Sequence, residues 1–323
     1  MKTDPAFQKE YSAVREGGAG LFDLSSRGLI EVSGGEAVMF LNGLITNDVQ
    51  SLPANTWMPA AFPNVQGRLL AISRVWRKDD KFYFDTEAAT RENVLKIVER
   101  FVPAGDFNVR DLSDETVCFS LQGKAAGQLF PADGKPPAPD QIAEFTFSDE
   151  KITVLEDADL SGGGYYFFVP KAVSEQFRNQ METAGAIPIS TETFEVLRIE
   201  SGLPLYGVDM DETTVVLETG LDKAVSFTKG CYIGQEIIAR IHFRGHVAKR
   251  LSGLIFDETA EVKPNDELRS SEGKPAGRVT SVTFSPKLQK TVALAYVRYE
   301  FLAEGTLLNT GDHTAKVANF PVL

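Results

Sequence analysis

The chain has 323 residues, a formal net charge of -12 and a hydrophobic fraction of 43%. This length exceeds the usual size of one domain, so we expect two or three domains that share interfaces. The negative charge disfavours non-specific nucleic-acid binding over the whole surface, because it repels phosphate backbones. The sequence contains no run of eighteen apolar residues and therefore supports no transmembrane helix.

The cysteine content and the N-terminal residues bear on the cellular compartment in which the protein is found. The sequence holds two cysteines, Cys118 and Cys231, which are too few for a disulfide framework or a zinc knuckle. Residues Met1–Phe7 lack the apolar core of a secretion signal. We therefore expect a cytoplasmic protein with free thiols and without a membrane or DNA partner.

The first third of the chain alternates predicted strands and helices. Residues 29–32 form a short apolar strand, and Ser33 and Glu36 then make a capping-box pattern at a helix start. The helix that follows carries an apolar stripe of Ala37, Phe40, Leu41, Leu44 and Ile45. The same reasoning predicts strands at 69–75 and 82–84 and a helix from Thr90 that ends before Pro103.

The middle third continues this alternation around a loop. A predicted strand at 116–121 contains Cys118, which we expect to pack in the core. Residues 131–139 hold four prolines and Gly134, a composition typical of a loop. Predicted strands follow at 151–155 and 165–169, and predicted helices at 172–181 and 194–199.

The last part of the chain has the pattern of a β-barrel. Strands are predicted at 251–256, 278–284 and 291–299, separated by turns that contain proline and glycine. These changes in pattern predict three domains. They are an N-terminal α/β domain at 1–115, a second α/β domain at 116–245 and a barrel domain at 246–323.

The segment Lys229–Glu236, here called the signature segment, has the features of a working site. Its two glycines allow the backbone to turn sharply or to approach a ligand. Because residues 235–240 are compatible with a helix, we expect Cys231 at or just before a helix N-terminus, where the dipole and Lys229 favour the thiolate. Such a thiol can act as a nucleophile, a redox thiol or a cluster ligand. Most free cysteines, however, only fill space in the core.

Cations outnumber acids between residues 229 and 250. The stretch contains one acid, Glu236, and the cations Lys229, Arg240, Arg244, Lys249 and Arg250. This local reversal of charge favours an anionic partner such as polyglutamylated folate, tRNA or an acidic protein surface, and a solvated strand edge explains it equally. Cys231, His242 and His246 are ligand types that suit a metal, but the two histidines would need a regular helix to share it and residues 243–245 disfavour one, so we predict no metal site.

Four stretches resemble the family of the bacterial YgfZ protein and the glycine-cleavage T-protein. The signature segment matches the family's K-G-C-Y-x-G-Q-E motif at every fixed position. The other matching stretches are Asp23–Ser25 with Phe40–Val49, similar to an N-terminal helix that ends in T-N-D; Asn64–Leu69, similar to a G-R strand; and Arg198–Asp209, similar to an R-x-E-x-G-x-P-x-x-G-x-D run. The resemblance spans essentially the whole chain except the proline-rich 131–139 region.

The resemblance implies a fold, a ligand and a set of site residues. The family fold is an α+β ring of two mixed α/β domains around a central hole for a folate, closed by a small C-terminal β-barrel. Tetrahydrofolate or a derivative is therefore the implied cofactor. The implied key thiol is Cys231, and the implied cofactor-binding residues are Asn47, Asp48, Arg198, Glu200, Lys229, Tyr232 and Gln235.

Structural roles remain open for four of these residues. The planar fork of Arg198 suits a folate tail carboxylate, and on a helix surface it would equally pair with Glu195 or Glu200. Glu200 is also suited to bracing the ring from inside. Asn47 and Asp48 are equally typical of a turn.

The family divides into two roles that the sequence helps to separate. T-proteins transfer an aminomethyl carbon to tetrahydrofolate, whereas YgfZ and its mitochondrial relatives support iron–sulfur enzymes, including those that thiomethylate tRNA. T-proteins carry a strand aspartate near the reacting nitrogen, since iminium formation needs an anionic group, and a glutamate that pairs with the pterin. Here Ala71 and Ile72 stand at the first place and Gly162 at the second.

Because these acids are absent and T-proteins lack a cysteine at position 231, the resemblance favours the YgfZ role. We expect a folate-binding accessory factor for the assembly or repair of iron–sulfur enzymes, without turnover of its own. Its expected partners are a folate and iron–sulfur enzymes or assembly proteins, with an indirect link to tRNA. The alternatives are a tetrahydrofolate-dependent aminomethyl (one-carbon) transferase of the T-protein type and a scaffold that binds a partner protein without a ligand.

Overall fold

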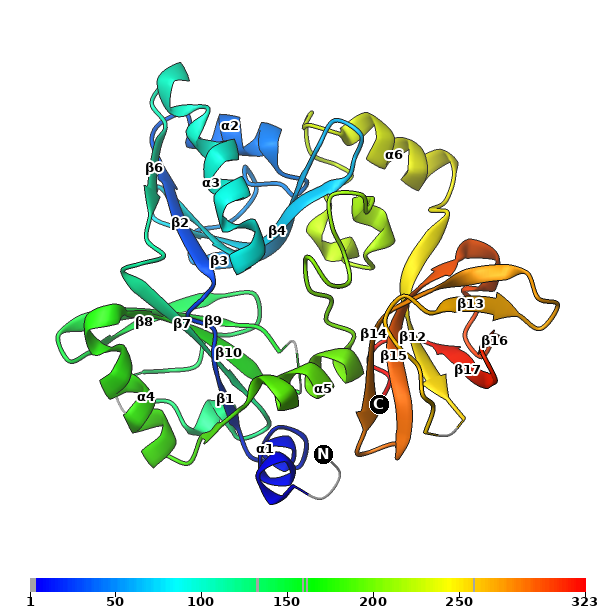
Figure 1. Ribbon diagram of the computed structural model, residues 1–323. Helices are drawn as coiled ribbons and strands as arrows, with labels where there is room; N and C mark the ends of the chain where they lie inside the picture. Colours follow the sequence, from blue (N-terminus) through cyan, green and yellow to red (C-terminus); the bar gives the residue numbers. More distant parts are fainter. Residues whose placement is uncertain (1–3, 132–133, 159, 161, 258) are drawn as a thin grey trace.

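The computed structural model describes residues 4–131, 134–158, 160, 162–257 and 259–323. A five-stranded sheet, a six-stranded sheet and a closed six-stranded barrel surround a central loop of residues 202–234 (Figure 1). This arrangement confirms the predicted fold class of an α+β ring with a closing barrel.

The first sheet has the strand order β3-β4-β5-β2-β6. Its elements are β2 (Gly28–Ser33), α2 (Ala37–Leu44), β3 (Thr56–Pro63), β4 (Leu69–Lys78), β5 (Lys81–Thr86), α3 (Arg91–Glu99) and β6 (Asn108–Asp111). The predicted apolar stripe of α2 is confirmed, because Ala37, Leu41, Leu44 and Ile45 are buried against the sheet. Helix α3 adds Val94 to the same core.

The start of α2 differs from the prediction. Glu36 is the N-cap residue and makes no side-chain cap bond, so the expected capping box with Ser33 is wrong. Instead, the Glu36 carboxylate accepts a hydrogen bond from the N–H of Asp106 (2.8 Å), and Asp106 accepts one from the N–H of Gly35 (2.7 Å). A residue distant in sequence therefore supplies the acceptor at this helix start.

Strand β4 presents its two faces to different surroundings. Ala71 and Val75 are buried in the core beneath α2 and α3. On the other face, Ile72 packs against apolar side chains of the central loop, and the ring of Trp76 lies 4.5 Å from that of Phe168 in the second sheet. Of the two positions where T-proteins would carry an acid, only position 72 therefore faces the centre of the ring.

The second sheet combines the N-terminus with the middle of the chain. Its strand order is β11-β1-β7-β10-β9-β8. The elements are α1 (Pro5–Arg15), β1 (Gly20–Asp23), β7 (Thr116–Gln122), β8 (Ile142–Phe147), β9 (Glu150–Glu156), β10 (Gly164–Pro170), α4 (Ser174–Thr183), β11 (Ile187–Pro188) and α5 (Thr191–Ser201). Cys118 is buried in β7, as expected.

The pairing of β1 bears on the predicted domains. Strand β1 pairs with β7 and with β11, so residues 20–23 belong to the second sheet although they lie within the predicted first domain, 1–115. The gaps between β6 and β7 and between α6 (Gln235–Arg244) and the barrel lie at the predicted boundaries. We propose to keep these two boundaries and to assign the N-terminal segment to the second domain.

The C-terminal part is a closed barrel. It consists of β12 (Lys249–Phe256), β13 (Glu267–Ser270), β14 (Pro275–Ser285), β15 (Lys290–Arg298), β16 (Leu307–Thr310) and β17 (His313–Ala318). Short 3₁₀ helices lie at Ala88–Thr90, Val102–Ala104, Ala126–Gln128, Lys171–Val173, Val216–Glu218, Asp222–Ala224 and Tyr299–Phe301. Among the described residues, no helix has both the length and the apolar composition that crossing a membrane requires.

Candidate functional site at the ring centre

The central loop contacts all three parts of the ring (Figure 1). The N–H of Tyr206 donates to Glu87, just after β5, over 2.9 Å. Asp209 accepts hydrogen bonds from Thr280 and Ser281 in barrel strand β14. The loop leaves α5, whose C-cap Gly202 is in the left-handed region (φ 80°). The loop therefore links the three parts of the ring.

Lys229 of the signature segment caps the end of helix α2. Its Nζ donates to the carbonyl oxygens of Asn42 (2.7 Å), Ile45 (2.9 Å) and Asn47 (2.6 Å). These carbonyls lie at or just after the negative end of the helix dipole, where a cation is stabilising. Burial lowers the pKa of the Lys229 ammonium to about 8, although the charge of Asp48 acts in the opposite direction. The structure thus gives Lys229 a clear structural role.

Cys231 is exposed and precedes a helix, as predicted. Helix α6 begins at Gln235 after the N-cap residue Gly234, which has a left-handed backbone (φ 78°). A Cβ on Gly234 would come within 2.4 Å of the Asn64 carbonyl oxygen, so this tight turn requires glycine. We expected the charge of Lys229 to favour the Cys231 thiolate. In the structure, the Lys229 ammonium donates instead to carbonyl oxygens at the end of α2.

Tyr232 and Gln235 flank this turn in different surroundings. Tyr232 is buried in an apolar cluster with Leu69 and Ile238, and burial raises the pKa of its phenol to about 12. Gln235 is half-buried, and its N–H donates to the Tyr232 carbonyl oxygen (3.2 Å). The signature segment therefore anchors α6 against β4 and leaves its thiol accessible.

Asn47 and Asp48 form a turn that is tied to the central loop. The Asn47 amide donates to the carbonyl oxygens of Pro59 (2.8 Å) and Lys223 (2.9 Å). The Asp48 carboxylate accepts from the N–H of Gln50 (3.1 Å), as a turn aspartate does. Both residues therefore have the turn role that the sequence also allowed. Their contact with a cofactor stays a prediction.

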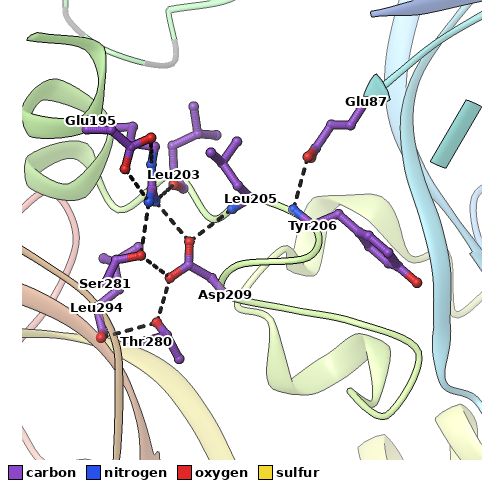
Figure 2. A network of polar contacts seen from close by, with 10 residues as sticks. Glu87, Glu195, Leu203, Leu205, Tyr206, Asp209, Thr280, Ser281 and Leu294 are labelled. Atoms are coloured by element: carbon purple, nitrogen blue, oxygen red, sulfur yellow. Dashed lines mark hydrogen bonds and ion pairs between the residues drawn. The ribbon is translucent and has the colours of Figure 1, made fainter. Parts of the chain in front are cut away.

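Arg198 joins α5 to the barrel through hydrogen bonds to Glu195, Asp209 and Ser281, the partners labelled in Figure 2. It is 1% exposed, and its guanidinium donates to Glu195, Asp209, Ser281 and the carbonyl oxygen of Leu203. These contacts engage all five N–H donors of the side chain. A folate carboxylate would have to displace one of these acceptors, so the predicted ligand role of Arg198 competes with a complete structural network.

Glu200 is a second buried link between α5 and its neighbours. Its carboxylate is fully buried and accepts from the hydroxyls of Tyr11 (2.8 Å) and Ser285 (2.6 Å). Arg15 of α1 forms an ion pair with it at 3.0 Å. Glu200 therefore braces the ring from inside by joining α1, α5 and β14, which is the structural alternative that the sequence allowed.

A charged cluster lies where the first sheet meets the second. Arg74 on β4 pairs with Asp85 on β5 (3.0 Å) and with Asp157, just after β9 of the second sheet (2.6 Å). Arg27 also pairs with Asp85 (2.6 Å), and the Arg74 guanidinium lies 3.8 Å from the Tyr166 ring centroid. We call Arg27, Arg74, Asp85 and Asp157 the ring-centre cluster. It continues along the β4 face that carries Ile72.

Glu87 adds a half-buried carboxylate to this region, and the sequence analysis missed it. Burial raises its pKa, although Arg27 and Arg74 favour its charged form. No motif marks it, because Glu87 lies after the end of β5 and reaches the centre only through strand pairing. The sequence feature that could have pointed to Glu87 was the predicted end of a strand near residue 84.

The two histidines of the basic stretch lie in separate aromatic contacts. His242, on α6, stacks on Phe227 with ring centroids 3.6 Å apart. His246 follows the helix and stacks on Tyr299 at 3.5 Å. Each imidazole thus has its own aromatic neighbour on a different element.

Comparisons with known proteins extend over both ends of the chain. Residues 1–153 match the GCVT N-terminal domain, and residues 249–321 match the glycine cleavage T-protein C-terminal barrel domain. An aminomethyltransferase of Thermoanaerobacter sp. (strain X514) is 30% identical over 309 residues, which cover 92% of this chain and 82% of that relative. The chain belongs to the aminomethyltransferase family, that of the glycine cleavage T-protein.

Two further relatives of this T-protein family member span most of its length. A putative chloroplastic transferase of Arabidopsis thaliana is 25% identical over 312 residues, covering 94% of this chain and 71% of the relative. The crystal structure of the glycine cleavage system aminomethyltransferase T from Bartonella henselae has a TM-score of 0.88 at 23% identity. That match covers 98% of this chain and 89% of the other and bears on the fold.

Within the T-protein fold, the positions that lack acids lie in different settings. Ile72 contributes an apolar side chain to the cluster beneath the central loop. Gly162 is exposed in a bend, and a Cβ built there would meet no described atom within 4 Å. The second position therefore has room for a side chain that this sequence does not use.

Proposed function

We propose that this protein binds a tetrahydrofolate at the ring centre and transfers a one-carbon unit, with aminomethyl transfer as the reaction class. The observation that carries the proposal is the similarity to aminomethyltransferases along nearly the whole chain, including the barrel. Members of the T-protein family use tetrahydrofolate, so a folate-type ligand is the cofactor that the family predicts. The charged groups around Arg74 and Glu87 provide polar partners for such a ligand.

Two measurements test this proposal. Calorimetry with tetrahydrofolate is expected to give saturable binding, because a folded ring with charged groups at its centre suits a polar aromatic ligand. An aminomethyl donor protein together with tetrahydrofolate is expected to yield methylene-tetrahydrofolate. Saturable binding without product would retain the folate site and reject the transferase.

A second candidate function is supported by the signature segment. The protein would then be a YgfZ-type folate-binding accessory factor for iron–sulfur enzymes, including tRNA-thiomethylating enzymes, with Cys231 as its thiol. The accessible thiol and the absence of acids at positions 72 and 162 favour this role. An iron–sulfur enzyme or assembly protein would be the partner, and tRNA would be linked to it only indirectly.

Replacing Cys231 in the source organism separates the two functions. Under the accessory role, Cys231→Ser is expected to lower thiomethylated tRNA adenosine and the activity of a cluster-containing enzyme. The matched control is Cys118→Ser, whose buried thiol packs in the cluster between the first and second sheets. Normal levels in the Cys231→Ser strain would reject the role of this thiol.

A further inference from the structure

Glu87 lies beside the strand position at which T-proteins carry an acid. In the β4–β5 pairing, Ser73 lies opposite Thr86, so the next pair along brings Glu87 beside Ile72. The Thr86 hydroxyl donates to the Ile72 carbonyl oxygen (3.4 Å), which places the end of β5 against this part of β4. Glu87 is therefore the neighbour of position 72 across the sheet.

The backbone of Glu87 is extended, so the alternation of side chains along β5 continues for one residue beyond the strand. Its dihedral angles (φ -66°, ψ 150°) are extended, before the 3₁₀ helix at 88–90 begins. Side chains alternate along an extended chain, so Glu87 shares the face of Asp85, which pairs with Arg74 in the ring-centre cluster. The carboxylate thus points to the same side as Ile72.

The surroundings of Glu87 leave part of its carboxylate for another partner. Oε2 accepts a hydrogen bond from the Tyr206 N–H of the central loop (2.9 Å), which fixes the side chain toward the ring centre (Figure 2). Glu87, Ile72 and Tyr206 all remain partly exposed, although each lies inside the ring. A positioned but accessible carboxylate is a group that a ligand can meet without first breaking the fold.

The charges around Glu87 support a proton-sensitive role. Arg27 and Arg74 face it and favour its ionised form, while the charge of Asp85 opposes ionisation. Glu87 in turn raises the pKa of the Tyr206 phenol, together with Glu212 and Asp211 and after burial as the main cause. Burial prevails over these charges and raises the pKa of Glu87 above that of an ordinary glutamate.

We infer that Glu87 supplies, from β5, the folate-contacting carboxylate that T-proteins carry on the neighbouring strand. This inference rests on the proposed folate site and adds the residue that replaces the missing acid. A carboxylate contributed from the adjacent strand can reach the same space, because same-face side chains of paired strands lie about 5 Å apart. In this protein the acid would come from β5 instead of β4, and the pairing of the two strands would be the same.

The test is calorimetry with tetrahydrofolate on the full-length protein and three variants. Glu87→Gln removes the charge and keeps an acceptor for the Tyr206 N–H. Glu87→Asp keeps the charge but shortens the side chain. Glu92→Gln is the control, because Glu92 is exposed on α3 and pairs with Lys96 four residues on. Circular dichroism melting confirms that each variant is folded.

We expect Glu87→Gln to weaken tetrahydrofolate binding by about tenfold, the size of one charge-assisted hydrogen bond. Glu92→Gln should bind like the unaltered protein, and Glu87→Asp should lie between the two. The affinity of the unaltered protein should fall as the pH drops through the raised pKa of Glu87, whereas Glu87→Gln should lack this fall.

Two results would overturn the inference in different ways. If the unaltered protein binds tetrahydrofolate and Glu87→Gln binds equally well with the same pH profile, the Glu87 contact is wrong and the folate site stands. If the unaltered protein shows no saturable binding, both the contact and the proposed function are wrong.

Discussion

Two networks of polar contacts, one around Arg198 and one around Arg74, differ in how far they are shielded from solvent. Arg198 is 1% exposed, and each of its donors meets an acceptor within the protein. The Arg74 side chain is 13% exposed, pairs with Asp85 and Asp157, and lies near the half-buried Glu87. The first network joins α5 to the barrel, and the second lines the meeting point of the two sheets.

This difference in exposure distinguishes charged side chains that stabilise the fold from charged side chains that a ligand can reach. A fully buried guanidinium with matched acceptors is costly to disturb, because removing one member leaves an unpaired buried charge. A partly exposed network retains access to solvent and to incoming groups. We therefore expect changes at Arg198 to act mainly on stability and changes near Arg74 to act on ligand binding as well.

The largest expected effect is that of Arg198→Met. It leaves the fully buried Asp209 without its ion-pair partner and should lower the free energy of unfolding by about 3–5 kcal/mol in urea titrations. The control is Arg178→Met, since the Arg178–Asp23 pair is much more exposed and should contribute less than about 1 kcal/mol. A stable Arg198→Met protein with lost folate binding would instead support the ligand role of Arg198.

Lys229→Met should have the next largest effect, and it should depend on pH. Three carbonyl oxygens around the end of α2 lose their donor, so we expect a loss of about 3 kcal/mol in unfolding free energy at pH 10.5. The pKa of Lys229 is lowered from 10.5 to about 8 in the folded state. Its contribution is therefore present at high pH, is lost as the pH falls from 10.5 to about 8, and changes no further below that pH.

Unfolding titrations of the Lys229→Met variant and the unaltered protein between pH 6 and pH 10.5 check this prediction. The difference in unfolding free energy should widen toward high pH, by up to about 3 kcal/mol for a shift of this size. A difference that is constant over this range would mean that Lys229 does not titrate as its burial suggests.

A smaller loss of stability is expected for Arg74→Met, together with an effect on binding. Asp85 keeps its pair with Arg27, so the unfolding free energy should fall by only about 2 kcal/mol. Tetrahydrofolate affinity should fall as well, because the charge beside Glu87 changes. Unfolding titrations and calorimetry on the same preparation measure both effects. A loss as large as that of Arg198→Met with unchanged affinity would remove the contrast between the two networks.

The sequence predicted the elements whose signal is local. The stripe of α2 and the barrel strands follow from periodicity, because side-chain burial repeats with the geometry of a helix or strand. The position of Cys231 before a helix followed from the helix-compatible residues 235–240 after Gly234. The expected pairing of Arg198 with Glu195 is confirmed, because i, i+3 pairing is also a local property, but Arg198 is buried and not on a helix surface.

The parts that escaped prediction depend on contacts between distant segments. Asp106 replaces the expected capping box at α2 from seventy residues away. Glu87 gains its place from the register of β5 against β4, which the sequence alone does not reveal. The full engagement of Arg198 requires Ser281 of the barrel, so no helix-based argument could have shown it.

The placement of β1 makes the first sheet an insertion within the second. Residues 20–23 pair with residues 119–122 and 187–188, while the first sheet is built from the intervening residues 28–111. During synthesis from the N-terminus, the first sheet can fold as soon as its own residues have left the ribosome. The second sheet must wait for partners that lie about a hundred residues downstream in β7 and farther still in β11. Translation order therefore favours a nested assembly, in which the inner unit forms first and the outer unit then closes around its ends.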